Sequence, residues 1–141
     1  MIAVDTNILV QAHREELDRH AQALARLRKL AEGGVPWGLP VFCLGEFARL
    51  VTHPRVFSPP STVDQALEAL DALLRSPSVR VLVPGPRYPQ LFADCLRTGD
   101  ARGNLAFDAQ IAAVCLEQGA RELLTLDRDF SRFQELTLAA L

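Results

Sequence analysis

A chain of 141 residues, 49% of them apolar, has the length and the material for one domain with its own core, and we expect a single domain over residues 1–141. The formal charge of −2 excludes a protein that holds nucleic acid over a broad basic surface, so any role with nucleic acid must be local. No stretch approaches the roughly 20 apolar residues of a membrane span, and no signal peptide precedes the first predicted strand; both observations favour a cytoplasmic protein.

Short predicted strands alternate with longer predicted helices along the chain. Residues 2–4 suit a buried strand, and the next elements are helices over 6–14 and 18–32, a strand over 35–39, a helix over 41–51 and a proline-rich loop over 53–61. A capping box of Ser61 and Asp64 is expected to open a helix over 62–75. The remaining elements are a strand over 79–83, a helix over 88–97, a loop over 98–104, a helix over 105–118, a strand over 122–126 and a short strand over 136–138. This alternation predicts a parallel sheet covered by helices on both faces.

The cysteines and histidines form no pattern typical of a metal or nucleophile site. Neither a CxxC pair nor a Cys/His cluster with zinc spacing occurs. We therefore expect three reduced core cysteines, Cys43, Cys95 and Cys115. The histidines are equally scattered, at His13, His20 and His53.

Four of the 17 acidic residues fall where core residues are expected. Asp5 and Asp127 each end a predicted apolar strand, while Glu46 and Asp108 share a helix face with core residues of their own helices. Because a buried, unpaired carboxylate is costly, such acids must be paired, gathered at a cleft, or bound to a cation. The carboxyl ends of parallel strands converge where the strand order reverses, so all four can face one crevice. Carboxylates without His or Cys select hard cations, and the pattern indicates a Mg²⁺ or Mn²⁺ site.

Each of these acids also has a purely structural interpretation. Asp5 and Asp127 could cap helices or form Asx turns, and Glu46 and Asp108 could pair with buried arginines. It is the coincidence of all four that favours a shared cation site.

The same residues carry a resemblance to a known family. Four segments together resemble the PIN domain, and more closely the VapC-type toxins of bacterial toxin–antitoxin pairs: MIAVDTNILV, LGEFARL, GNLAFDAQIAAVCLEQGA and LLTLDRDF. The resemblance covers the whole chain, and the order and spacing of the four motifs make it specific. It implies a three-layer α/β/α fold with a parallel sheet of about five strands, and a metal-dependent ribonuclease.

The resemblance further implies roles for single residues. The acidic positions of the family correspond to Asp5, Glu46, Asp108 and Asp127, as ligands of Mg²⁺ or Mn²⁺ and as catalytic groups.

Polar neighbours are expected to hold these acids in place. Thr6 or Asn7 would hold the acid after the first strand, and Thr125 would act similarly near the acid after the fourth. The segment DRD offers Asp129 as an alternative fourth acid; the position at the strand end favours Asp127, and Asp129 is expected to cap a short helical turn.

We expect hydrolysis of an RNA phosphodiester, with one or two cations that activate a water molecule and stabilise the charge of the transition state. The resemblance implies three partners: an RNA substrate, a VapB-type antitoxin whose C-terminal segment covers the site, and a second copy of the chain in a homodimer. Several arginines near loops could hold the RNA backbone or be ordinary solvated charges: Arg49, Arg55, Arg102 and Arg128.

Two other function classes remain open from the residues alone. A Mg²⁺-dependent phosphotransfer module also places acids at strand ends, but a receiver domain needs a lysine after a late strand and the only lysine is Lys29. A haloacid-dehalogenase-like phosphatase needs an acid two residues after its nucleophile, where this chain has Asn7. A PIN-like RNA-processing or RNA-binding module without catalysis is the other alternative, although such a module is expected to have lost some of the acids.

Overall fold

The computed structural model describes all residues from 1 to 141, and its elements follow the predicted alternation. The strands are β1 (Ile2–Val4), β2 (Trp37–Pro40), β3 (Val79–Leu82), β4 (Glu122–Leu124) and β5 (Thr137–Ala139). The helices are α1 (Thr6–His13), α2 (His20–Glu32), α3 (Val41–Val51), α4 (Val63–Leu74), α5 (Tyr88–Thr98) and α6 (Leu105–Glu117), with a short 3-10 helix η1 (Arg128–Arg132). None of the helices is both long and apolar enough to cross a membrane.

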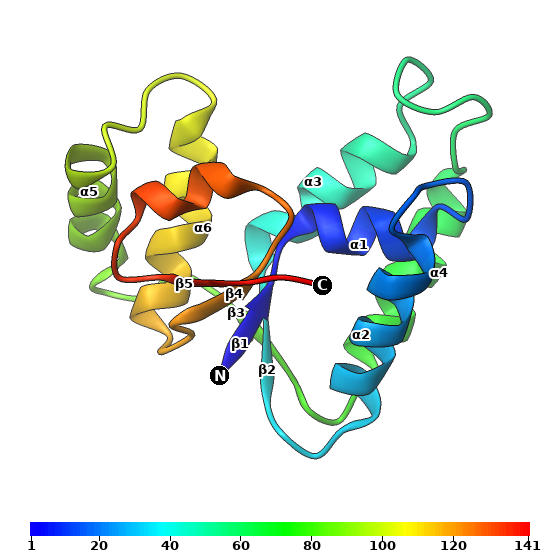
Figure 1. Ribbon diagram of the computed structural model, residues 1–141, viewed down its shortest axis with the longest axis horizontal. Coiled ribbons are helices and arrows are strands. Elements are labelled where there is room, and N and C mark those ends of the chain that lie inside the picture. Colours follow the sequence, from blue (N-terminus) through cyan, green and yellow to red (C-terminus); the bar gives the residue numbers. More distant parts are fainter.

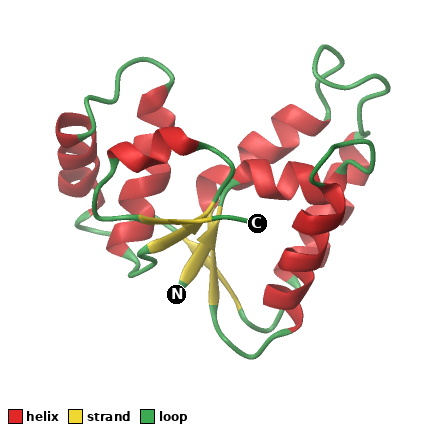
Figure 2. Cartoon of the chain, in the orientation of Figure 1, coloured by secondary structure: helices red, strands yellow, loops and turns green.

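The five strands form one parallel sheet in the order β3-β2-β1-β4-β5. Figure 1 shows α5 and α6 on one side of this sheet and α1, α2, α3 and α4 on the other, and Figure 2 shows the strands gathered between the two groups of helices. The predicted three-layer α/β/α fold is therefore confirmed.

The strand order reverses at β1, which is the central strand of the sheet. β2 and β3 lie on one side of β1, and β4 and β5 lie on the other. Open parallel sheets bind ligands in the crevice outside the carboxyl ends of the strands at such a reversal. The crevice of this protein therefore lies beyond β1 and β4.

Helix α6 contributes more buried residues than any other helix. Its segment Ile111–Cys115 is buried throughout, and alanines at 109, 112 and 113 let neighbouring elements approach closely. Gly119 ends the helix with φ = 79°, a left-handed conformation that suits glycine, and the Ala120 N–H closes the turn by donating to the Cys115 carbonyl at 2.8 Å. All three cysteines are buried and free, as predicted.

The structure corrects the predicted start of α4. The capping box is formed by Thr62 and Gln65, not by Ser61 and Asp64: the Thr62 hydroxyl accepts from the Gln65 N–H at 3.1 Å, and the Gln65 side chain accepts from the Thr62 N–H at 2.9 Å. Ser61 is instead buried and accepts from the Arg14 guanidinium at 3.1 Å. The pattern of residue types fits both registers, and only the long-range partner of Ser61 distinguishes them.

Smaller differences concern the strands. β2 lies one to two residues further along the chain than expected, over Trp37–Pro40, and β5 spans Thr137–Ala139, one residue later than predicted. β4 ends at Leu124, two residues earlier than predicted; the Thr125 N–H still donates to the Ala139 carbonyl at 3.2 Å, and its side chain reaches the site described below.

Candidate metal centre

A cavity of about 270 Å³ lies at the crevice, and all four acids singled out from the sequence line it. Asp5 comes from the end of β1, Asp127 from the segment after β4, Glu46 from α3 and Asp108 from the first turn of α6. The other lining residues are Asn7, Val10, Gln11, Leu50 and Phe130. The lining contains no Lys, Arg or His, so no fixed cation balances the four carboxylates.

Asp5 is held in one orientation by its neighbours. One carboxylate oxygen accepts from the Thr6 N–H at 2.7 Å, so that Asp5 also caps α1. The other oxygen accepts from the Asn7 amide and from the Thr125 hydroxyl, both at 2.7 Å. The predicted cap and the predicted polar neighbours are therefore both present, and Asn7 and Thr125 both hold Asp5.

Asn7 and Thr125 also join the ends of β1 and β4. The Asn7 amide donates to the Thr125 hydroxyl oxygen at 3.1 Å, and its carbonyl oxygen accepts from the Leu126 N–H at 3.1 Å. The Thr125 hydroxyl oxygen in turn accepts from the Asp127 N–H at 2.9 Å. One hydroxyl therefore sets the position of Asp5 relative to Asp127 across the crevice.

The structure corrects the assignment of the two acids in DRD. Asp127, not Asp129, caps the short helix η1: its carboxylate accepts from the Asp129 N–H at 2.8 Å. Asp129 is exposed and does not line the cavity, but one oxygen each of Asp108, Asp127 and Asp129 lie within 4.8 Å of one another. The two acids of DRD are therefore not alternatives, because both lie beside Asp108.

Glu46 and Asp108 form no hydrogen bond and no ion pair, which excludes the alternative in which buried arginines neutralise them. Their carboxylates are partly buried and face the cavity. Both carboxylates have all their lone pairs available to a ligand.

The pKa values of two carboxyl groups in the cavity, Asp5 and Asp108, are raised, so their charged forms are disfavoured. Burial raises the pKa of Asp5 to about 6, with smaller contributions from Glu46 and Asp127, against the hydrogen bonds from Thr125 and Thr6 that lower it. Burial also raises the pKa of Asp108 to about 7, and the charge of Asp127 adds to the shift. Carboxyl groups with such pKa values bind a proton near neutral pH unless a cation takes its place.

The donor set fits a hard divalent cation. The cavity offers carboxylate oxygens and amide oxygens and neither thiolate nor imidazole, which is the ligand chemistry of Mg²⁺ and Mn²⁺. Fold and cavity together define a parallel α/β protein with an acidic cavity, suited to a cation, at the reversal of its strand order.

Comparison with known proteins identifies the family. The family model of the PIN domain matches residues 2–136. Ribonuclease VapC43 of Mycobacterium tuberculosis and VapC ribonuclease Mb2897 of Mycobacterium bovis are each 43% identical to this chain over 136 residues, which is 96% of this chain and 92% of each relative. VapBC2 from Rickettsia felis, solved with a DNA fragment of its promoter, has the same fold: the TM-score is 0.70 at 22% identity, covering 100% of this chain and 99% of that one. The chain thus belongs to the PIN domain family and, within it, to the VapC ribonucleases of toxin–antitoxin pairs, which confirms the predicted family and the predicted enzyme class.

Gln11 is the polar lining residue that sequence reasoning missed. It follows Asn7 by four residues on α1, so the two share a helix face, and this spacing was the available signal. Its side-chain oxygen accepts from the Arg19 N–H at 3.0 Å, which ties the site to the start of α2.

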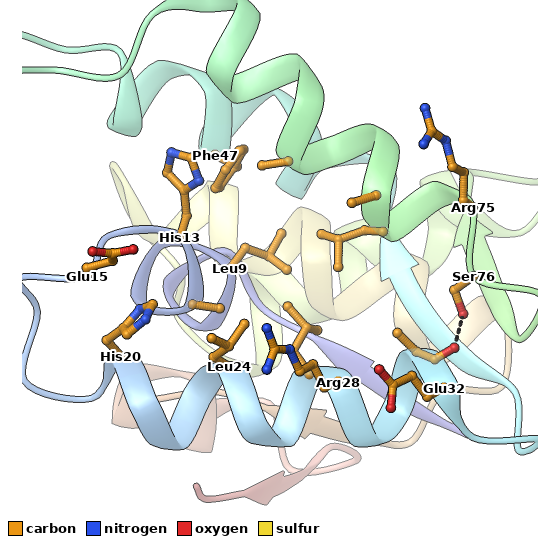
Figure 3. Close-up of a pocket in the computed structure, with 16 residues that line it drawn as sticks. Leu9, His13, Glu15, His20, Leu24, Arg28, Glu32, Phe47, Arg75 and Ser76 are labelled. Carbon is orange, nitrogen blue, oxygen red and sulfur yellow. Dashed lines mark hydrogen bonds between the residues drawn. The ribbon is translucent and has the colours of Figure 1, made fainter.

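A larger cavity of about 590 Å³ lies between α1, α2, α3 and α4, away from the four acids (Figure 3). Its walls are mainly apolar. Its two carboxylates, Glu15 and Glu32, are accompanied by four basic side chains: His13, His20, Arg28 and Arg75. His13 and His20, which form no pattern in the sequence, thus line the same cavity. Because the charges in this cavity are balanced, it does not have the character of a cation site.

Proposed function

We propose that this chain hydrolyses RNA phosphodiester bonds at the acidic cavity, with Mg²⁺ or Mn²⁺ held by Asp5, Glu46, Asp108 and Asp127. The observation that carries the proposal is the gathering of four carboxylates in one cavity that has no basic side chain. A bound divalent cation supplies activation of a water molecule and stabilisation of the negative charge that builds up on the phosphate. The alternative phosphotransfer modules are not supported, because the chain belongs to the VapC ribonucleases.

The four acids divide into two pairs by their surroundings. The carboxylates of Asp5 and Asp127 each accept a backbone N–H, and the Asp5 carboxylate also accepts the Thr125 hydroxyl, so both are suited to hold a cation in a constant position. Glu46 and Asp108 have no partner and are suited either to complete the ligand set or to accept the proton of the attacking water. Asp129, more exposed and next to Asp108 and Asp127, is an outer ligand in this scheme.

The RNA backbone is proposed to contact arginines near the loops, none of which lines the cavity itself. Arg49, Arg55 and Arg128 are exposed and form no ion pair, so their charges are available to phosphate. Arg102 is less suitable, since its guanidinium makes two hydrogen bonds, of 3.0 and 2.9 Å, to the Asp100 carboxylate.

We further propose a VapB-type antitoxin as the partner of this chain, with a C-terminal segment that covers the acidic cavity, and a homodimer as its assembly. The support is the similarity to toxin–antitoxin complexes, among them VapBC2 and the FitAB complex. Action in the cytoplasm stays a prediction from the sequence.

The test is cleavage of labelled total RNA by the purified chain. We expect cleavage in Mn²⁺ or Mg²⁺, none in the presence of a chelator, and a loss of at least about a hundredfold in Asp5→Asn, in line with the loss of a charged group essential to catalysis. Asp64→Asn, which changes an exposed acid of α4, is the matched control and keeps full activity. Binding of RNA without any metal-dependent cleavage would instead favour the PIN-like RNA-binding module.

A further inference from the structure

One aromatic ring of this chain is left without a packing partner. Six of the seven phenylalanines, the tryptophan and the tyrosine belong to the core or pack against it, whereas Phe107 does not and is 61% exposed. Phe107 is also absent from every aromatic pair of the structure. Burying a phenylalanine stabilises a fold, and the Phe107 ring contributes little of this stabilisation, so most of its surface is available to a ligand.

Phe107 does not line the acidic cavity itself, but it is the residue next to one that does. Phe107 directly precedes Asp108, whose carboxylate lines the cavity, and both belong to the first turn of α6. Figure 1 shows α6 starting at the end of the sheet where β1 runs into α1, which is the end that carries the cavity. Because helical side chains lean towards the N-terminus of their helix, both side chains point towards this end of the sheet.

The immediate surroundings leave one face of the ring open. A side chain at position 107 leans over the turn that precedes α6, which contains Gly103 and the N-cap Asn104. Both are exposed, and even an added Cβ at Gly103 would meet no atom within 4 Å. Three residues further along the helix lies Gln110, which is polar and half-buried. The Phe107 ring is therefore an isolated apolar side chain among polar residues, and it does not belong to a continuous apolar surface.

These observations, together with the proposed function on which the inference rests, identify a ligand for the ring. We propose that Phe107 stacks on an unpaired base of the RNA substrate next to the phosphate that is cleaved. The flat face of a base is the part of RNA that an isolated aromatic ring recognises, and bases are accessible in this way in single-stranded segments, loops and bulges. The preferred substrate is then single-stranded RNA at the cleavage site. Phe107 is a substrate-binding residue and takes no part in the chemistry.

The test compares RNA with and without the stacked base. The probe is a labelled single-stranded RNA that the wild-type chain cleaves in Mn²⁺, alongside the same RNA with an abasic nucleotide placed in turn on each side of the cleaved bond. We expect Phe107→Ala to raise KM about tenfold on the intact RNA, as the loss of one base–aromatic stack predicts. We also expect Phe107→Trp to keep KM near the wild-type value. On one of the two abasic RNAs the wild type and Phe107→Ala should become equal.

Leu67→Ala is the control, because Leu67 is similarly exposed (55%) but lies on α4 and lines no part of the acidic cavity. Equal KM values for wild type and Phe107→Ala on the intact RNA would overturn the inference, and so would the same loss on both abasic RNAs. A Phe107→Ala protein whose mass in light scattering falls from dimer to monomer would also overturn it, since the ring would then belong to an interface between copies. A wild-type chain that cleaves no RNA would overturn the proposed function itself. The failure of the proposed function can therefore be distinguished from the failure of the stacking inference.

Discussion

The metal-free protein is expected to lose stability as the pH rises, and Asp5→Asn is expected to remove part of that loss. Asp5 is only 4% exposed, and burial raises its pKa from 3.8 to about 6. The folded chain therefore binds the Asp5 proton more tightly than the unfolded chain does, and between these two values it carries more protons. By linkage, the free energy of unfolding is highest below the unfolded pKa and falls as the pH rises through the folded pKa.

The two pKa values of Asp5 determine the size of the effect. Between about pH 5 and about pH 7.5 they give a loss of about 1.4 kcal/mol in the free energy of unfolding from this group alone. For a chain of 141 residues this corresponds to a fall of about 5 °C in the unfolding midpoint. Asp108 acts in the same direction, because its pKa is also raised, to about 7.

The assay is thermal unfolding followed by circular dichroism in chelator, over this pH range, for wild type, Asp5→Asn and the control Asp64→Asn. The amide that replaces the Asp5 carboxylate cannot accept every hydrogen bond that the carboxylate accepts from Thr6, Asn7 and Thr125, so the variant also loses hydrogen bonds at every pH. The readout is therefore the slope of the midpoint against pH and not its absolute value. We expect a shallower slope for Asp5→Asn and a wild-type slope for Asp64→Asn. A slope for Asp5→Asn that parallels the wild type would refute the reasoning.

Three further predictions concern the metal site, the hydroxyl that positions its acids, and the capping box of α4. Mn²⁺ at about 100 times its dissociation constant should stabilise the wild type by about 2.7 kcal/mol, and Asp108→Asn should reduce this gain; equal shifts of the midpoint in both proteins would argue against the shared site. Thr125→Val removes the hydroxyl that joins two of the acids and should weaken Mn²⁺ binding about 10- to 100-fold in calorimetry, whereas unchanged affinity would mean that the hydroxyl does not position the ligands. Thr62→Ala should lower the free energy of unfolding in urea by about 1 kcal/mol, while Asp64→Ala should leave it nearly unchanged; the reverse order would restore the capping box expected from the sequence.

The sequence was informative wherever a local pattern determines the structure. The apolar segments at 2–4 and 122–126 end in Asp5 and Asp127, so strand ends and acids could be placed together, and the sheet then had to bring them to one edge. The helix faces of Glu46 and Asp108 likewise followed from periodicity. Local patterns were thus sufficient to predict which four acids line the cavity.

Features that depend on long-range contacts or on the geometry of a single turn could not be predicted. Ser61 bonds to Arg14, 47 residues away, and this contact moves the capping box to Thr62. The proximity of the Asp129 carboxylate to Asp108 and Asp127 depends on the 3-10 turn that Asp127 caps. The exposure of Phe107 was not predicted, although Asn104 and Gln110, its neighbours at helical spacing, are polar; Leu105, Ala106 and Ala109, which lie close to it in the sequence, are apolar and all less exposed.

The most direct test of the central claim is the position of Mn²⁺ in a crystal of this protein. Anomalous diffraction is predicted to show a manganese peak inside the cavity, with carboxylate oxygens of Asp5, Asp108 and Asp127 at coordination distance, near the roughly 2.0–2.1 Å that Mg²⁺ adopts with oxygen ligands. Manganese found only at surface carboxylates, with the cavity free of anomalous signal at saturating Mn²⁺, would contradict the account.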